Sequence, residues 1–169
     1  MMHLHKSTRT LAVAQQPSKA AVTAWTRLVR AQQALVAAIE GDLKQAGLPP
    51  LAWYDVLLEL DRAPDGRLTP GALQDAILLA QYNLSRLLDR LEAEGLVRRV
   101  PYPGDKRRQW LEISKEGRAL RTRMWPAYAA SLQRHVGAKL TSSQAQALAD
   151  LLALLVPPRS SYLMLSNTP

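Results

Sequence analysis

The sequence predicts a mainly α-helical protein with one small β-wing, and three observations support this fold class. Most of the chain repeats its apolar residues at three- and four-residue steps, the period of an amphipathic helix. Gly95 ends one such helix, and two short β-type segments follow at residues 96–100 and 110–114. Residues 101–109, which join them as a long loop, are rich in proline and basic side chains. A helix followed at once by a basic hairpin is the order of a winged helix-turn-helix.

Six predicted helices account for most of the chain, and local start and stop signals delimit them. Thr69 followed by Pro70 reads as an N-cap with proline in the first turn, and residues 141–144 match a capping box. Pro126 lies inside the fifth helix and predicts a kink or a local break there. A very short strand is expected at residues 67–68. The helices are expected at residues 18–46, 50–62, 69–77, 81–94, 114–136 and 142–156.

The first helix is long, at about 30 residues, and carries an apolar stripe. Such a terminal helix often packs against a second subunit; the alternative is that it covers its own domain. We therefore expect a two-fold homodimer formed through the terminal helices. The expected segments are a flexible arm (1–16), a dimerisation helix (17–48), the winged helix-turn-helix domain (49–116), further dimerisation helices (117–156) and a C-terminal tail (157–169).

Charge and composition narrow the class of partner. The formal net charge is +8 and the sequence pI about 10.2, which favours an acidic partner such as nucleic acid or an anionic membrane surface. Much of the excess is local, because residues 98–123 hold nine Lys/Arg against three acids. Without cysteine, disulfides and thiol chemistry are excluded. No apolar run is long enough to span a bilayer, so we expect a cytoplasmic protein without membrane contact.

The fourth predicted helix has one leucine face and one polar face. Arginine can bind guanine through two hydrogen bonds, asparagine and glutamine can pair with adenine, and serine or tyrosine can hold a phosphate. The alternative is an ordinary solvated helix face. The candidate DNA-reading residues are Gln81, Tyr82, Asn83, Ser85, Arg86 and Arg90.

The hairpin strengthens the nucleic-acid hypothesis. Its tip carries three consecutive basic residues, and arginine suits the minor groove, where the negative potential is strongest. Asp105 is expected to pair with Arg107 and fix the shape of the hairpin. The alternative is a basic surface loop, which the helix directly before it makes less favourable. The candidate wing residues are Asp105, Lys106, Arg107 and Arg108.

Four stretches make the pattern specific: residues 84–92 read LSRLLDRLE, 94–99 EGLVRR, 105–107 DKR and 113–117 ISKEG. The chain resembles the MarR family of transcriptional regulators over about residues 20–156. The resemblance implies six helices, a two-stranded wing, a two-fold dimer, and double-stranded DNA with a near-palindromic operator as partner. It also implies a repressor. Two positions depart from the family: Ala80 stands where serine often caps the recognition helix, and Ala72 where an acid is frequent.

MarR-like proteins commonly bind aromatic or anionic effectors, and the chain offers aromatic and basic residues for such a pocket. The competing explanation is core packing, because tryptophan on an amphipathic helix is most often buried. The candidate effector residues are Trp25, Arg27, Arg30, Trp53, Tyr54, Met124, Trp125 and Tyr128.

Two other classes of function compete with DNA binding. Catalysis needs a nucleophile, a base and an orienting group, and no nucleotide-binding loop or zinc-protease motif occurs. We expect no enzyme activity, no cofactor and no metal, although His3 and His5 offer a weak alternative metal pair. The stronger rival is a winged-helix module that mediates protein contact or dimerisation and does not read DNA.

Overall fold

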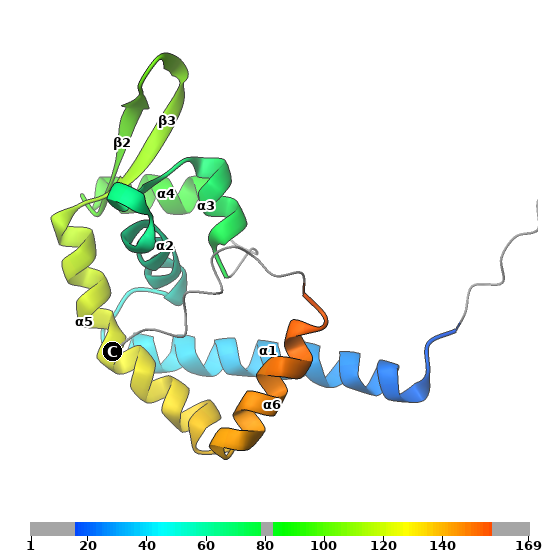
Figure 1. Ribbon diagram of the computed structural model, residues 1–169. Helices are drawn as coiled ribbons and strands as arrows, with labels where there is room; N and C mark the ends of the chain where they lie inside the picture. The colour runs from blue at the N-terminus through cyan, green and yellow to red at the C-terminus, as the bar shows by residue number, and fades with distance from the viewer. Residues whose placement is uncertain (1–15, 79–82, 157–169) are drawn as a thin grey trace, which may run out of the picture. The chain divides into compact units, whose positions relative to one another are not determined.

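The structure is a computed structural model that describes residues 16–78 and 83–156, with the backbone alone at Lys106 and Arg107 (Figure 1). The chain divides into two compact units, residues 1–34 and 35–169. The described helices are α1 (Lys19–Gln45), α2 (Leu51–Arg62), α3 (Pro70–Ala76), α4 (Leu84–Ala93), α5 (Lys115–Leu132) and α6 (Ser142–Ala153). The strands are β1 (Arg67–Leu68), β2 (Val97–Tyr102) and β3 (Asp105–Ile113).

A 3₁₀ turn, η1 (Pro64–Gly66), and a π-helical turn, η2 (Gln133–Gly137), complete the described elements. The predicted arm, apart from residue 16, and the predicted tail lie outside the described residues. Six helices and a small antiparallel sheet confirm the predicted fold class. The boundaries of the five predicted segments stay a prediction.

The helix ends show why these segments fold where they do. The side chains of Thr69 and Ser114 accept hydrogen bonds from the first turns of α3 and α5. Thr141 forms the predicted capping box with Gln144. At the other end of α4, the Leu96 N–H donates to the Leu91 carbonyl at 2.8 Å, which closes the helix around Gly95. Local sequence therefore sets these boundaries.

The core of the second unit forms where α2, α3, α4, the sheet and the first turns of α5 meet (Figure 1). The sheet order is β1-β3-β2, so β3 is central. The short strand predicted at residues 67–68 is β1, and the structure shows that it pairs with β3. Gly117, on the first turn of α5, allows close packing, because a Cβ there would lie 2.3 Å from the Leu96 carbonyl oxygen. The fully buried side chains include Leu43, Leu57, Leu60, Leu73, Leu91, Leu111, Ile113 and Met124.

The prediction of a long loop at residues 101–109 was wrong. Both strands continue almost to the tip, where only Pro103 and Gly104 separate Tyr102 from its partner Asp105. Pro101 is tolerated in β2 because β2 is an edge strand of the described sheet and proline lacks only the N–H. Proline and charge indicate a loop when the segment is considered alone, but cross-strand pairing extends the ladder.

Two helix predictions also need correction. The fourth helix begins at Leu84 rather than near Gln81, because the Asn83 side chain caps it at that point. The fifth helix is not broken at Pro126, because α5 continues to Leu132 and the π-helical turn η2 follows it. A proline ring can remain in a helix at the loss of one backbone hydrogen bond. The alternative, a kink at Pro126, stays a prediction.

Candidate nucleic-acid interface

Helix α4 presents the polar face that the sequence predicts for a recognition helix. Its four leucines (Leu84, Leu87, Leu88 and Leu91) are buried in the core. Ser85, Arg86 and Arg90 are exposed. Two further predicted contacts, Gln81 and Tyr82, lie outside the described residues. The described part of this face is therefore free to meet a polar partner.

Asn83 has a structural task that the sequence analysis missed. Its Oδ1 accepts a hydrogen bond from the Arg86 backbone N–H at 3.2 Å, and Asn83 is the N-cap of α4. A two-bond contact with adenine uses both the oxygen and the amide nitrogen of asparagine. The oxygen already accepts the helix N–H, so the cap competes with the predicted base contact. An asparagine directly before an apolar run is a sequence signal for a helix N-cap, and it could have predicted this role.

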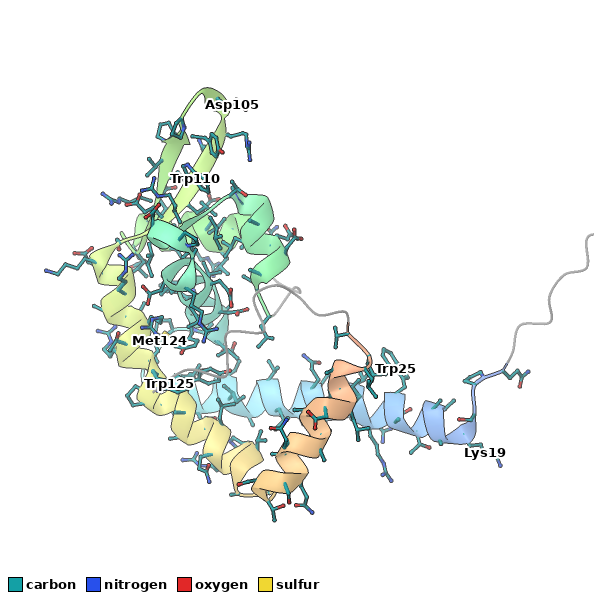
Figure 2. All side chains as sticks on the ribbon, in the orientation of Figure 1. Lys19, Trp25, Asp105, Trp110, Met124 and Trp125 are labelled. Atoms are coloured by element: carbon teal, nitrogen blue, oxygen red, sulfur yellow. The ribbon has the colours of Figure 1, made fainter. Side chains whose placement is uncertain are left out.

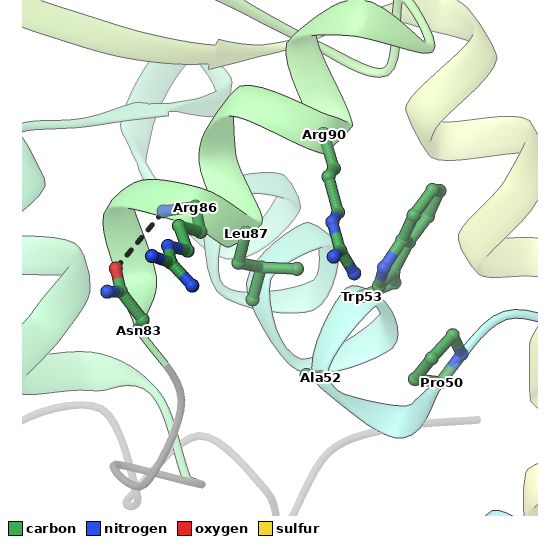
Figure 3. A pocket seen from close by; sticks show the side chains of 7 residues that line it. All are labelled: Pro50, Ala52, Trp53, Asn83, Arg86, Leu87 and Arg90. Carbon is green, nitrogen blue, oxygen red and sulfur yellow. Dashed lines mark hydrogen bonds between the residues drawn. The ribbon is translucent and has the colours of Figure 1, made fainter.

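A small hollow of about 220 Å³ lies between the start of α2 and α4 (Figure 3). In Figure 3 the Arg90 side chain extends toward Trp53, and the dashed line marks the Asn83 cap. The hollow thus combines an indole ring with two arginines of the recognition helix. Its lining residues are Pro50, Ala52, Trp53, Asn83, Arg86, Leu87 and Arg90.

An ion-pair network attaches the wing to the recognition helix. Arg99, on β2, donates to Asp89 at 2.6 Å and also contacts Glu92, both on α4. The hydrogen bond that Arg99 donates to Asp89 is the largest of the effects that raise the pKa of Arg99. Asp89 and Glu92 are three residues apart and share one face of the helix. Two acids at this spacing, followed by an arginine after the turn at Gly95, are a sequence signal for an ion pair between the helix and the next strand. The sequence-based prediction did not include this ion pair.

The wing carries the predicted basic residues on β3. Arg108 is exposed, with its guanidinium 4.4 Å from the centre of the Tyr102 ring. The side chains of Lys106 and Arg107 are not among those described, so the predicted pairing of Asp105 with Arg107 stays a prediction. At the base of the wing, Arg98 and Glu112 pair across the strands at 2.6 Å. Asp105 and Trp110 mark the hairpin in Figure 2.

Five of the eight predicted effector residues lie in the second unit, and the pocket itself stays a prediction. Tyr54, Trp125 and Tyr128 pack together, with the Tyr54 and Tyr128 ring centres 5.0 Å apart. Burial raises the pKa of Tyr54. Met124 is fully buried in the core, while Trp53 lines the hollow beside α4. The other three, Trp25, Arg27 and Arg30, belong to the first unit.

Two further findings bear on the class of protein. Among the described helices, not one has both the length and the apolar character of a membrane span. Within the same described residues, no three His, Asp or Glu side chains cluster in a way that suits a metal ion.

A capped helix with a polar outer face, packed on a small sheet that ends in a basic hairpin, defines a winged helix-turn-helix protein. A family model described as MarR family matches residues 46–108. The chain is similar to the MarR family of transcriptional regulators over this segment, which confirms the resemblance that the sequence motifs predicted.

Individual relatives agree with the family. The chain is 36% identical over 73 residues to the HTH-type transcriptional regulator PecS of Dickeya dadantii, an alignment that covers 42% of this chain and 43% of PecS. It is 28% identical over 92 residues to the multiple antibiotic resistance protein MarR of Salmonella typhimurium, covering 54% and 64% of the two chains. The chain therefore spans less than two thirds of the length of these curated relatives.

A solved structure resembles nearly the whole described fold. Sco3205 of Streptomyces coelicolor, a MarR family transcriptional regulator crystallised in complex with DNA, superposes with a TM-score of 0.73. Sequence identity is 25%, and the match covers 83% of this chain and 88% of Sco3205. The likeness therefore extends beyond the segment matched by the family model.

Proposed function

We propose that this protein is a sequence-specific regulator of transcription that binds double-stranded DNA. In the proposal, α4 enters the major groove and the β2–β3 wing reaches the adjacent minor groove. One observation carries it: the exposed arginines of α4 and the basic wing are tied to each other through Arg99 and its acidic partners. A rigidly joined helix and wing can approach two neighbouring grooves together.

The comparisons support a DNA partner. Sco3205 was crystallised with DNA, and it resembles this chain over most of its length. The location of positive charge agrees with this partner, because β2, β3 and the start of α5 hold much of the net excess. Since the proposed partner is DNA, the cytoplasmic location expected from the sequence remains part of the proposal.

A DNA titration tests the proposal. Duplexes recovered from a random-sequence library by rounds of binding selection should share one motif, and affinity for them should fall steeply as salt rises. Arg86→Ala should change base preference at one position, at a loss of about 1–3 kcal/mol. Arg107→Ala should weaken binding to all duplexes and make the salt dependence shallower.

Arg123→Ala is the matched control, because Arg123 is an exposed arginine on α5 outside both proposed contact elements. Its affinity should stay close to that of the parent. Selection that yields no shared motif, together with salt-independent binding, would leave the rival hypothesis, a winged-helix module for protein contact. That rival predicts that Arg86→Ala and Arg123→Ala have equal effects on DNA affinity.

The proposed regulator acts as a homodimer. The support is α6, which has no buried residue although leucines line it. Half-sites about 10 bp apart in a near-palindrome would match a two-fold pair of recognition helices. Leu151→Glu should produce a monomer by analytical ultracentrifugation, with weaker binding to the selected duplex. A Leu151→Glu protein that sediments as a dimer would contradict the use of α6 in the interface.

An aromatic anion is the proposed effector, and the hollow between α2 and α4 is its proposed site. Trp53 offers a ring to stack on, and Arg90 offers a charge, at the helix that is proposed to read DNA. An occupant would compete with DNA for the arginines and so relieve repression. Benzoate is a suitable probe and neutral benzamide its control: benzoate alone should release the duplex, and Arg90→Ala should abolish the release. Equal effects of the two probes would argue against the site.

A further inference from the structure

The wing contains an irregularity centred on its basic residues. Pro101 pairs with Gln109 and the next residue, Tyr102, pairs with Asp105, so the register shifts between these two pairs, opposite residues 106–108 of β3. These are the three consecutive basic residues of the chain's wing. Extra residues in one strand bend it and turn its side chains in new directions. At the tip, proline followed by Gly104 at φ +81° fits a tight turn that needs glycine.

One of the three basic residues has a defined aromatic support. The Tyr102 and Trp110 rings stack, with centres 4.8 Å apart and planes 26° apart. The Arg108 guanidinium lies 4.4 Å from the centre of the same Tyr102 ring. Tyr102 thus links a half-buried tryptophan, anchored in the ladder, to an exposed cation in the irregular segment.

We propose that Tyr102 is a positioning residue for DNA binding, which holds the Arg108 guanidinium where the wing meets a phosphate. The inference rests on the proposed function, since it assigns a role within the same interface. In this view the wing presents a fixed cation supported by an aromatic stack.

The geometry of arginine makes this arrangement effective. A guanidinium stacks on a ring through its flat face, and its N–H donors point outward in its own plane. The edge that forms two hydrogen bonds with a phosphate therefore stays available while the face rests on Tyr102. A free arginine side chain loses much rotational freedom when it binds, and a side chain already held over a ring loses less.

The competing explanation is that Arg108 only covers an exposed ring and never meets DNA. Both explanations predict the contact in the free protein, so the contact itself does not separate them. Energetic coupling does: if Tyr102 acts on DNA through Arg108, removing the ring should matter only while the arginine is present.

The first experiment tests the stack in free protein by NMR. The Arg108 Cδ protons should shift upfield in the parent because they lie over an aromatic ring. Tyr102→Phe should retain the shift and Tyr102→Ala should lose it. Circular dichroism of each variant confirms that the fold is intact. Unshifted Arg108 protons in the parent would overturn the inference without any use of DNA.

The second experiment measures the role, using the duplex selected by the parent protein at several salt concentrations. An exposed cation–π contact corresponds to a loss of about three- to fivefold in affinity for Tyr102→Ala. Tyr102→Phe should bind within about twofold of the parent, since it keeps the ring. Arg108→Ala should weaken binding and reduce the salt slope by about one. Once Arg108 is alanine, Tyr102→Ala should cause no further loss.

The outcomes separate the inference from the proposed function. A parent protein that shows no salt-sensitive DNA binding removes the proposed function and the role of Tyr102 with it. If the parent binds, independent losses in Tyr102→Ala and Arg108→Ala that multiply in the double variant overturn the inference alone. So does failure of Tyr102→Phe to restore affinity, because a hydroxyl contact and not the ring would then be responsible.

Discussion

Helices α4 and α6 are similar in sequence pattern and opposite in burial. Both carry a face of leucines, and both begin at a side-chain cap, Asn83 in α4 and Thr141 in α6. In α4 the four leucines are at most 9% exposed, whereas Leu151 on α6 is 63% exposed and Leu148 45%. An amphipathic pattern shows that a helix has an apolar face to bury. Only the surrounding structure shows what that face packs against. Within the described residues, the leucine face of α4 is packed against other elements and that of α6 is not.

The largest effect should come from truncating one leucine on each helix. Leu91→Ala removes a fully buried side chain and should lower the free energy of unfolding by about 2–5 kcal/mol at any protein concentration. Leu151→Ala should change it by less than about 0.5 kcal/mol in dilute protein. If α6 packs in a dimer, the loss at Leu151 should grow with protein concentration, because association stabilises the folded state. Urea unfolding at two concentrations measures both.

Alanine substitutions at two glycines, Gly117 and Gly41, test how closely the elements pack around each. Gly117→Ala places a Cβ 2.3 Å from the Leu96 carbonyl oxygen and should destabilise the protein by about 1–3 kcal/mol. A Cβ added at Gly41, which also lies within a helix, would meet no atom within 4 Å apart from the backbone of its own helix. Gly41→Ala should therefore stabilise by about 0.5–1 kcal/mol, through helix propensity alone. Thermal unfolding of the two variants should move in opposite directions; a shift in the same direction would contradict the close approach.

The two caps provide a finer test of the same contrast. Asn83→Ala and Thr141→Ala each remove a cap worth about 1 kcal/mol. The loss at Asn83 should lower the thermal midpoint of the whole winged-helix domain, because α4 is part of its core. The loss at Thr141 should reduce helical circular dichroism and leave that midpoint nearly unchanged. Asn83→Ser, which retains a capping oxygen, is the control and should behave like the parent.

The smallest effect concerns the turn that leads into α6. Asp42 on α1 accepts hydrogen bonds from Ser131 at 2.6 Å, His135 at 2.9 Å and Arg134 at 2.9 Å. The Ser131 bond is the main cause of a lowered pKa at Asp42. A lowered pKa in the folded state means that the carboxylate stabilises the protein above its ordinary pKa of about 4, and that this contribution fades as pH falls through the lowered value.

Asp42→Asn therefore separates from the parent most clearly near neutral pH. The difference in unfolding midpoint should stay constant down to about pH 5 and then shrink as the solution becomes more acidic. Unfolding by urea across a pH series measures it. A difference that persists unchanged at the acidic end would mean that the Asp42 side chain contributes through shape and not through charge.

Local signals predicted the helices better than the strands. Thr69 and Thr141 cap their helices as expected, because a cap involves only residues three positions apart. The length of β3 was missed, because strand pairing joins residues that are distant in sequence and overrides the loop-like composition of the wing. The candidate site shows the same division: the exposed Arg86 and Arg90 were found from periodicity, and the Arg99 network was not.

Neighbouring aromatic residues illustrate what periodicity leaves open. Trp53 and Tyr54 are adjacent on α2, yet Trp53 lines the hollow beside α4 and Tyr54 is buried against Trp125 and Tyr128 of α5. One residue step on a helix turns the side chain by about 100 degrees. The sequence pattern does not show which element packs on each side of α2. That knowledge is needed to decide whether the two residues share an effector pocket.

The amino-acid sequence by itself determined the order of the elements, the ends of most helices and the resemblance to the MarR family, because caps, glycine stops and apolar spacing act over a few residues. The tertiary structure alone decided which apolar faces are covered, where the wing becomes irregular, and that Tyr102 supports Arg108. Those features arise when distant segments compete for the same contacts, and the outcome depends on shape and not on any single stretch of chain.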